Sequence, residues 1–111
     1  MKKSAYLNNA SNPKLAKAVL RQLGTEWKEL IENISDYRNA SNGVHGFIYY
    51  SDTVKFAKRN HLLILQELAE LEADCGILKK PSPSDETKYF NWLAWFALEH
   101  IVSEIEDELT H

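Results

Sequence analysis

The chain has 111 residues and a formal net charge of −3, with 44% hydrophobic and 26% charged residues. This length suits one domain, and the composition is that of a soluble globular protein rather than a disordered or fibrous one. The single cysteine, Cys75, excludes an internal disulfide and a thiolate zinc cluster, and the scarcity of Gly (4) and Pro (3) argues against a turn-rich β-sandwich or barrel.

Two helices are predicted in the N-terminal part of the chain. Residues 1–11 are polar and rich in asparagine, so we expect them to be loosely ordered. Asn12 can cap the first helix, Pro13 fits its first position, and Gly24 ends it. Thr25 can cap the second helix, whose apolar stripe consists of Trp27, Leu30, Ile31 and Ile34.

Two longer helices are predicted in the C-terminal part. Ser51 or Asp52 can cap the third helix, which ends at Gly76 and has an apolar seam with alternating steps of three and four: Val54, Ala57, His61, Ile64, Leu68, Leu71 and Cys75. The fourth helix runs from about Asp85 to Leu109. The sequence therefore predicts an all-α fold: one compact four-helix domain over residues 1–111, with an irregular aromatic segment at about residues 43–50 between the second and third helices.

Charge is unevenly distributed along the chain. Residues 1–61 contain ten Lys/Arg and five Asp/Glu, whereas residues 62–111 contain three and eleven. Many acidic residues lie toward the C-terminal ends of the two long helices, where the helix dipole disfavours negative charge. We therefore expect a shared acidic patch at these helix ends that binds a partner protein with a basic surface through Glu67, Glu70, Asp74, Glu99, Glu104, Glu106, Asp107 and Glu108. The alternative is that these carboxylates face water or the protein's own lysines and arginines.

No catalytic motif is present, so we expect a non-enzymatic protein without a cofactor or a bound metal. His61 and Cys75 lie on the apolar seam and are predicted to be core residues. A small helical metalloprotein is an alternative, with ligands from His100, Glu104, Glu108 and His111. Another alternative is a nucleic-acid-binding regulator, although the pI near 5.8 opposes general nucleic-acid binding. Its contacts would come from Tyr49, Tyr50, Lys55, Lys58 and Arg59.

The longest apolar run, Trp92 to Leu98, has seven residues, compared with the roughly 20 that a membrane-spanning helix requires. The N-terminal residues also lack the apolar stretch of a secretory signal. We therefore expect a cytoplasmic protein that does not span a membrane. Trp92, Trp95 and Phe96 extend apolar character around the first half of the fourth helix, which is typical of a central helix or of one covered by a second subunit. We therefore expect self-association through the Trp92/Trp95 face as a homodimer.

Two stretches of the sequence resemble a known group of proteins. They are Gly46-Phe47-Ile48-Tyr49-Tyr50-Ser51-Asp52-Thr53 and Asn91-Trp92-Leu93-Ala94-Trp95-Phe96-Ala97-Leu98-Glu99. Together they resemble small, functionally uncharacterised proteins carried by phages, prophages and plasmids. The resemblance implies an accessory protein in the host cytoplasm that binds host machinery, with a CRISPR or restriction complex as the expected target of an acidic inhibitor.

Overall fold

The computed structural model describes residues 1–38 and 50–110, and this part of the chain forms helices without any strand. The all-α prediction is confirmed. The expected irregular aromatic segment at 43–50 lies outside the described residues, except for Tyr50. The described residues form seven helices: α1 (Lys3–Asn9), α2 (Pro13–Leu23), α3 (Trp27–Glu32), α4 (Ile34–Arg38), α5 (Tyr50–Arg59), α6 (His61–Cys75) and α7 (Glu86–Leu109).

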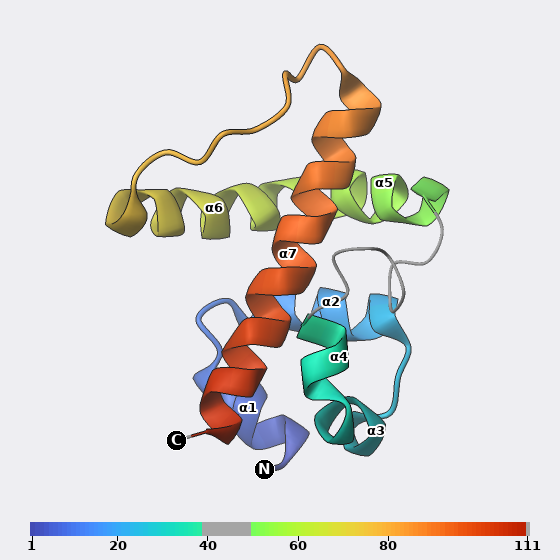
Figure 1. Ribbon diagram of the computed structural model, residues 1–111, viewed down its shortest axis with the longest axis vertical. Coiled ribbons are helices and arrows are strands. Elements are labelled where there is room, and N and C mark those ends of the chain that lie inside the picture. Colours follow the sequence, from blue (N-terminus) through green and yellow to red (C-terminus); the bar gives the residue numbers. More distant parts are fainter. Residues whose placement is uncertain (39–49, 111) are drawn as a thin grey trace.

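Helix α7 is the central element of the fold (Figure 1). It has 24 residues, and α2, α4, α5 and α6 pack against it, α5 most extensively. In Figure 1, α5 and α6 cross the N-terminal half of α7, whereas α1 to α4 lie beside its C-terminal half. The buried positions of α7 recur at helical spacing and form the middle of the hydrophobic core: Leu93, Ala94, Ala97, Leu98, Ile101, Val102 and Ile105. Helix α7 is apolar on several sides of its sequence because neighbouring helices cover it over much of its length.

Local sequence signals set the ends of α2 and the start of α7 as predicted. The Oδ1 atom of Asn12 accepts a hydrogen bond from the Leu15 N–H at 3.1 Å, and Pro13 begins the helix. Gly24 ends α2 with a φ of 65°, a left-handed conformation that glycine adopts without a Cβ penalty. At the start of α7, the Asp85 side chain accepts from the Lys88 N–H.

The predicted second and third helices are each interrupted, so the four-helix arrangement is not confirmed. Asn33 separates α3 from α4, and Asn60 separates α5 from α6. Each asparagine donates its side-chain N–H to the carbonyl four residues earlier, at 2.9 Å. Thr25 does not cap α3. Its hydroxyl instead lies 2.9 Å from the Tyr37 hydroxyl.

Residues 1–11 are not the loose end that their polar composition suggested. They include α1, whose Tyr6 side chain is completely buried. The Tyr6 ring stacks on Trp27 with 5.9 Å between ring centroids, and the Trp27 indole N–H donates to the Met1 carbonyl. One large aromatic side chain therefore fastens the N-terminal helix to the core, because its burial removes a large apolar area from water.

Two seam residues of the predicted third helix are not core residues. Cys75 is exposed in the last turn of α6. His61 is half-buried, and its ring makes edge contacts with Tyr89 and Phe90 at centroid distances of 6.0 Å and 5.1 Å. Along α6 the apolar seam is therefore buried only in the middle of the helix, at Ile64 and Leu68. Among the described residues, no helix combines the length and apolar character that crossing a membrane would require.

Candidate functional site

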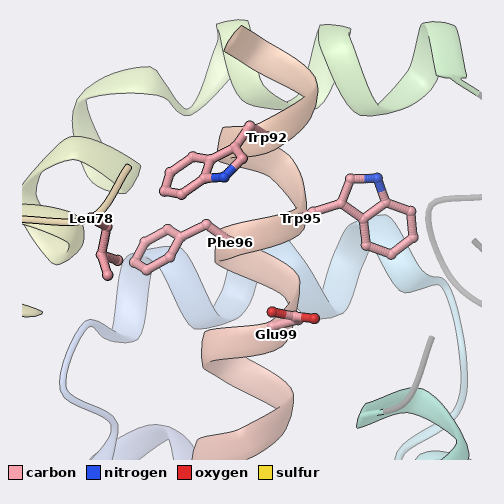
Figure 2. Close-up of a pocket in the computed structure, with 5 residues that line it drawn as sticks. All are labelled: Leu78, Trp92, Trp95, Phe96 and Glu99. Carbon is pink, nitrogen blue, oxygen red and sulfur yellow. The ribbon is translucent and has the colours of Figure 1, made fainter. Parts of the chain in front are cut away.

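An apolar hollow lies on the outer face of α7 (Figure 2). It has a volume of about 220 Å³ and is lined by Leu78, Trp92, Trp95, Phe96 and Glu99. Trp92 and Phe96 lie one turn apart and stack in parallel, with 5.8 Å between ring centroids and 3° between ring planes. Figure 2 shows both rings on the side of α7 that faces Leu78, whereas Trp95 points to the other side. Trp92 and Trp95 nevertheless both line this hollow, so the predicted Trp92/Trp95 self-association face stays a prediction.

The far wall of this hollow comes from the connection between α6 and α7. The Leu78 backbone N–H donates to Glu72 Oε2 at 2.7 Å, and Lys80 Nζ donates to the same oxygen at 2.8 Å. The hydrogen bond from Lys80, together with that from the Leu78 N–H, lowers the pKa of the Glu72 carboxyl below its usual range. Glu72 thus holds Leu78 opposite Phe96.

Two further hollows, each of about 290 Å³, continue this surface along α7 toward its C-terminal end. Phe96 and Glu99 line both the apolar hollow and the next one, and His100 and Ser103 line both the second and the third. We call the three hollows together the α7 groove; its first part is aromatic and its last part is acidic. The remaining lining residues of the second and third hollows are Leu71, Glu104, Asp107 and Glu108.

A polar network lies beside the acidic part of the groove and joins α1, α6 and α7. The Tyr6 hydroxyl donates to Glu104 Oε1 at 2.7 Å. The Ser11 Oγ lies 2.8 Å from Glu104 Oε2 and 2.9 Å from Glu67 Oε1. The His100 Nε2 lies 2.6 Å from Glu67 Oε1, an ion-pair distance when the imidazole is protonated, but the two groups are not aligned as a hydrogen bond. Five side chains from distant parts of the sequence therefore meet here.

Burial raises the pKa of Tyr6 far above its usual range, and the hydrogen bond to Glu104 and the negative charge of that carboxylate raise it further. The Tyr6 hydroxyl consequently keeps its proton and serves as a donor. Glu67 is 4% exposed, so it is a structural residue of the network and not part of an accessible patch.

The eight carboxylates expected to bind a partner do not form one surface. Glu99, Asp107 and Glu108 line the α7 groove, together with the network residue Glu104. Glu106 accepts a hydrogen bond from the Ser35 hydroxyl of α4 at 3.3 Å. Glu70 and Asp74 are exposed on α6. Because α6 crosses α7, the C-terminal ends of the two helices lie on different sides of the molecule (Figure 1).

The described residues of each alternative function lie on one helix: Tyr50, Lys55, Lys58 and Arg59 on α5, and His100, Glu104 and Glu108 on α7, where these three line the third hollow. Lys58 pairs with Glu86 and lies over the Phe90 ring, 5.5 Å from its centroid, while Lys55 and Arg59 are exposed. Tyr49 and His111 lie outside the described residues. Within the described ranges, no group of three or more His, Cys, Asp or Glu side chains is arranged to hold a metal ion.

Sequence reasoning identified the aromatic residues Trp92 and Trp95 but missed Leu78 and the hydroxyl residues of this region. Leu78 lies two residues after Gly76, in the connection between α6 and α7. The apolar pair Ile77–Leu78 was the only signal in the sequence that this connection contacts the rest of the protein. No local signal marks Ser11 or Tyr6, because their partners are 56 to 98 residues away in the chain.

Comparison with curated proteins and with solved structures finds no match. One protein family does match, over residues 8–111, a range that begins within α1 and includes all of α2 to α7. The range contains the whole α7 groove and every network residue except Tyr6. The chain belongs to this family, which is described as a domain of unknown function (DUF7222).

Proposed function

We propose that this protein is a non-enzymatic binding protein whose α7 groove takes a basic segment of a partner protein, with an apolar side chain of that segment as anchor. The observation that carries this proposal is the direct continuation of the aromatic hollow into the acidic part of the groove. Phe96 and Glu99 line the first two hollows together, so an apolar contact and a charge contact lie side by side.

The size and lining of the aromatic hollow favour a side chain as its occupant. Its volume of about 220 Å³ is below the roughly 300–1,000 Å³ of typical small-molecule sites. A large apolar side chain that enters a desolvated pocket is the usual energetic centre of a protein interface. Here the stacked rings of Trp92 and Phe96 provide one wall and Leu78 provides another.

The negative charge of the acidic part of the groove favours binding of a basic segment. Glu99 and Asp107 are exposed and Glu108 is half-buried, and no hydrogen bond or ion pair occupies any of these three carboxylates within the described part of the chain. Such carboxylates attract lysine and arginine side chains and suppress acidic partners, which gives specificity and a faster association.

The resemblance to proteins of phages, prophages and plasmids supplies the biological setting of the proposal. In that setting the protein is an accessory protein of a mobile element in the host cytoplasm, and its partner is a host defence complex of the CRISPR or restriction type. Such complexes have basic channels for nucleic acid, which an acidic groove can complement.

The test compares two variants with the same change of net charge. In the groove variant, Glu99→Gln, Asp107→Asn and Glu108→Gln remove the groove charges. In the control variant, Glu29→Gln, Glu32→Gln and Asp36→Asn remove three exposed charges of α3 and α4. Each tagged protein is used to capture proteins from a host lysate, and the retained proteins are identified by mass spectrometry.

We expect the wild type and the control variant to retain the same basic host protein and the groove variant to lose it. A Phe96→Ala variant should lose it too, because the anchor pocket is opened. Equal retention by all variants would contradict the proposal.

Light scattering on the wild type and on Trp92→Ser tests the expected homodimer, in which a second copy covers the aromatic hollow.

A further inference from the structure

The first two helices of the protein are strongly electropositive. Residues 1–25 contain five Lys/Arg and no Asp/Glu, although the whole chain contains 16 acidic residues. Helices α1 and α2 pack against each other, which brings Lys3 of α1 near Lys17 and Arg21 of α2. Helix α2 packs against α7. Among the described residues, however, no lysine or arginine of α1 or α2 forms an ion pair with a carboxylate of α7.

A pocket of about 350 Å³ lies between α1 and α2. Lys3 and Leu7 of α1 and Lys17, Leu20 and Arg21 of α2 line it. The three cations are exposed, and none of them forms an ion pair with any residue that the structure describes. The pocket thus has an apolar floor and a rim of one sign of charge.

This arrangement is unfavourable for the protein alone. Lys17 and Arg21 are four residues apart on one helix, and like charges at this spacing repel by a few tenths of a kcal/mol. Lys3 adds a third positive charge from the neighbouring helix. An anion placed among the three side chains would convert this repulsion into attraction.

We propose that this pocket binds a phosphoryl group, carried either by a free nucleotide or by the backbone of a nucleic-acid strand. Three cations exceed what a single carboxylate would neutralise, whereas a phosphate presents several oxygens and up to two charges. The Arg21 guanidinium can bind two phosphate oxygens at once, and lysine ammonium groups supply point charges beside it. Leu7 and Leu20 offer contact to the organic part of the ligand.

The cations of α2 also extend beyond the pocket. Lys14, Lys17 and Arg21 have spacings of three and four and so follow one face of α2, a distance of about 10 Å along the helix. A row of this length can contact more than one phosphate of a strand. None of these residues lines the α7 groove, so the pocket and the groove are independent, and either proposal can fail without the other.

The test uses the full-length protein and two double variants of equal net charge. The pocket variant carries Lys17→Gln and Arg21→Gln. The control variant carries Lys79→Gln and Lys88→Gln, two exposed lysines outside the pocket. Binding is measured at low salt by fluorescence anisotropy with a labelled 12-nucleotide DNA strand and with a labelled ATP analogue, and circular dichroism confirms that both variants remain helical.

We expect the wild type and the control to bind at least one of the two probes, with inorganic phosphate as a competitor, and the pocket variant to bind it at least about tenfold more weakly. If the strand is the ligand, the dependence of log affinity on log salt should also become shallower by about 1.4 for the two lost contacts. Binding of the strand alone or of the nucleotide alone identifies the source of the phosphate.

Three results would overturn the proposal. The first is that the wild type binds neither probe. The second is that the pocket variant and the control variant bind equally well. The third is that a polyglutamate peptide competes as well as phosphate-containing probes do, since this would indicate a site for any anion.

Discussion

The side chain of Tyr6 attaches α1 to the rest of the molecule. Tyr6 is fully buried and donates to Glu104, and its pKa is raised far above the usual range. In the unfolded chain a tyrosine loses its proton near pH 10. Between that pH and the pKa in the folded protein, the folded state therefore holds a proton that the unfolded state has lost, so the contribution of Tyr6 to stability is complete below pH 10 and decreases as the pH rises above it.

We predict that the free energy of unfolding decreases above pH 10, with up to about 1.4 kcal/mol per pH unit from Tyr6. Urea denaturation between pH 7 and pH 11 measures this dependence. Tyr6→Phe should lower stability by about 2 kcal/mol at pH 7, because Glu104 loses a hydrogen bond to a charged group, and should make the alkaline decrease less steep.

Tyr89→Phe is the matched control. Tyr89 is half-buried, and its hydroxyl lies 3.5 Å from His61 Nε2, a weak contact. This variant should change stability by less than about 0.5 kcal/mol. An alkaline decrease that is equally steep in Tyr6→Phe and in the wild type would show that Tyr6 is not its source.

At the level of elements, both ends of α2 and the start of α7 were predicted correctly, whereas the Thr25 cap and the helix breaks were not. Asn12, Gly24 and Asp85 act on residues within four positions, so the sequence alone reveals them. The breaks at Asn33 and Asn60 occur within continuous apolar periods, and each involves one side-chain bond to the preceding turn. Asparagine makes such bonds without always ending a helix, which is why the pattern did not predict the breaks.

Gly24 gives the first prediction for an element. Gly24→Ala should destabilise the protein by about 1–2 kcal/mol, because its φ of 65° is left-handed. The cost is backbone strain, since an added Cβ would meet no atom within 4 Å. Gly24→Asn should cost less because asparagine tolerates this conformation. Thermal unfolding followed by circular dichroism checks the order of the three proteins, and equal stability of all three would contradict it.

Glu72 gives the second prediction. Glu72→Gln weakens the acceptor that holds the Leu78 N–H, so the Leu78 amide should exchange with solvent faster. Lys80→Gln removes only the ion pair and should affect this amide less. Hydrogen exchange measured by NMR distinguishes the two variants. Unchanged protection of Leu78 in Glu72→Gln would mean that the connection is held by other contacts.

At the scale of the whole molecule, the sequence revealed the separation of charge but not its arrangement in space. The acidic bias of the C-terminal half is correct as a count, yet α6 crosses α7, so the C-terminal ends of these two acidic helices lie apart. Crossing angles depend on how side chains pack between helices, which periodicity alone does not specify. For the same reason the sequence predicted the groove acids and the aromatic face of Trp92 and Trp95 as separate features, without Leu78 and without their meeting in one groove.

The N-terminal segment gives the prediction for the whole molecule. Deletion of residues 1–9 removes Tyr6 and its bond to Glu104 and should cost about 3–5 kcal/mol, the range for truncating a buried aromatic residue. With typical domain stabilities of about 5–15 kcal/mol, the shortened protein should unfold at a much lower temperature. An unchanged unfolding midpoint would show that α1 is not part of the cooperative unit.

The position of Ser11 has a consequence for how two helices communicate. Its hydroxyl has one hydrogen but lies within bonding distance of a carboxylate from α6 and of another from α7. The single hydrogen of Ser11 is therefore shared between Glu67 of α6 and Glu104 of α7, and each carboxylate competes with the other for it. Ser11 thus couples the positions of two carboxylates on different helices, and Ser11→Ala would leave both without this donor.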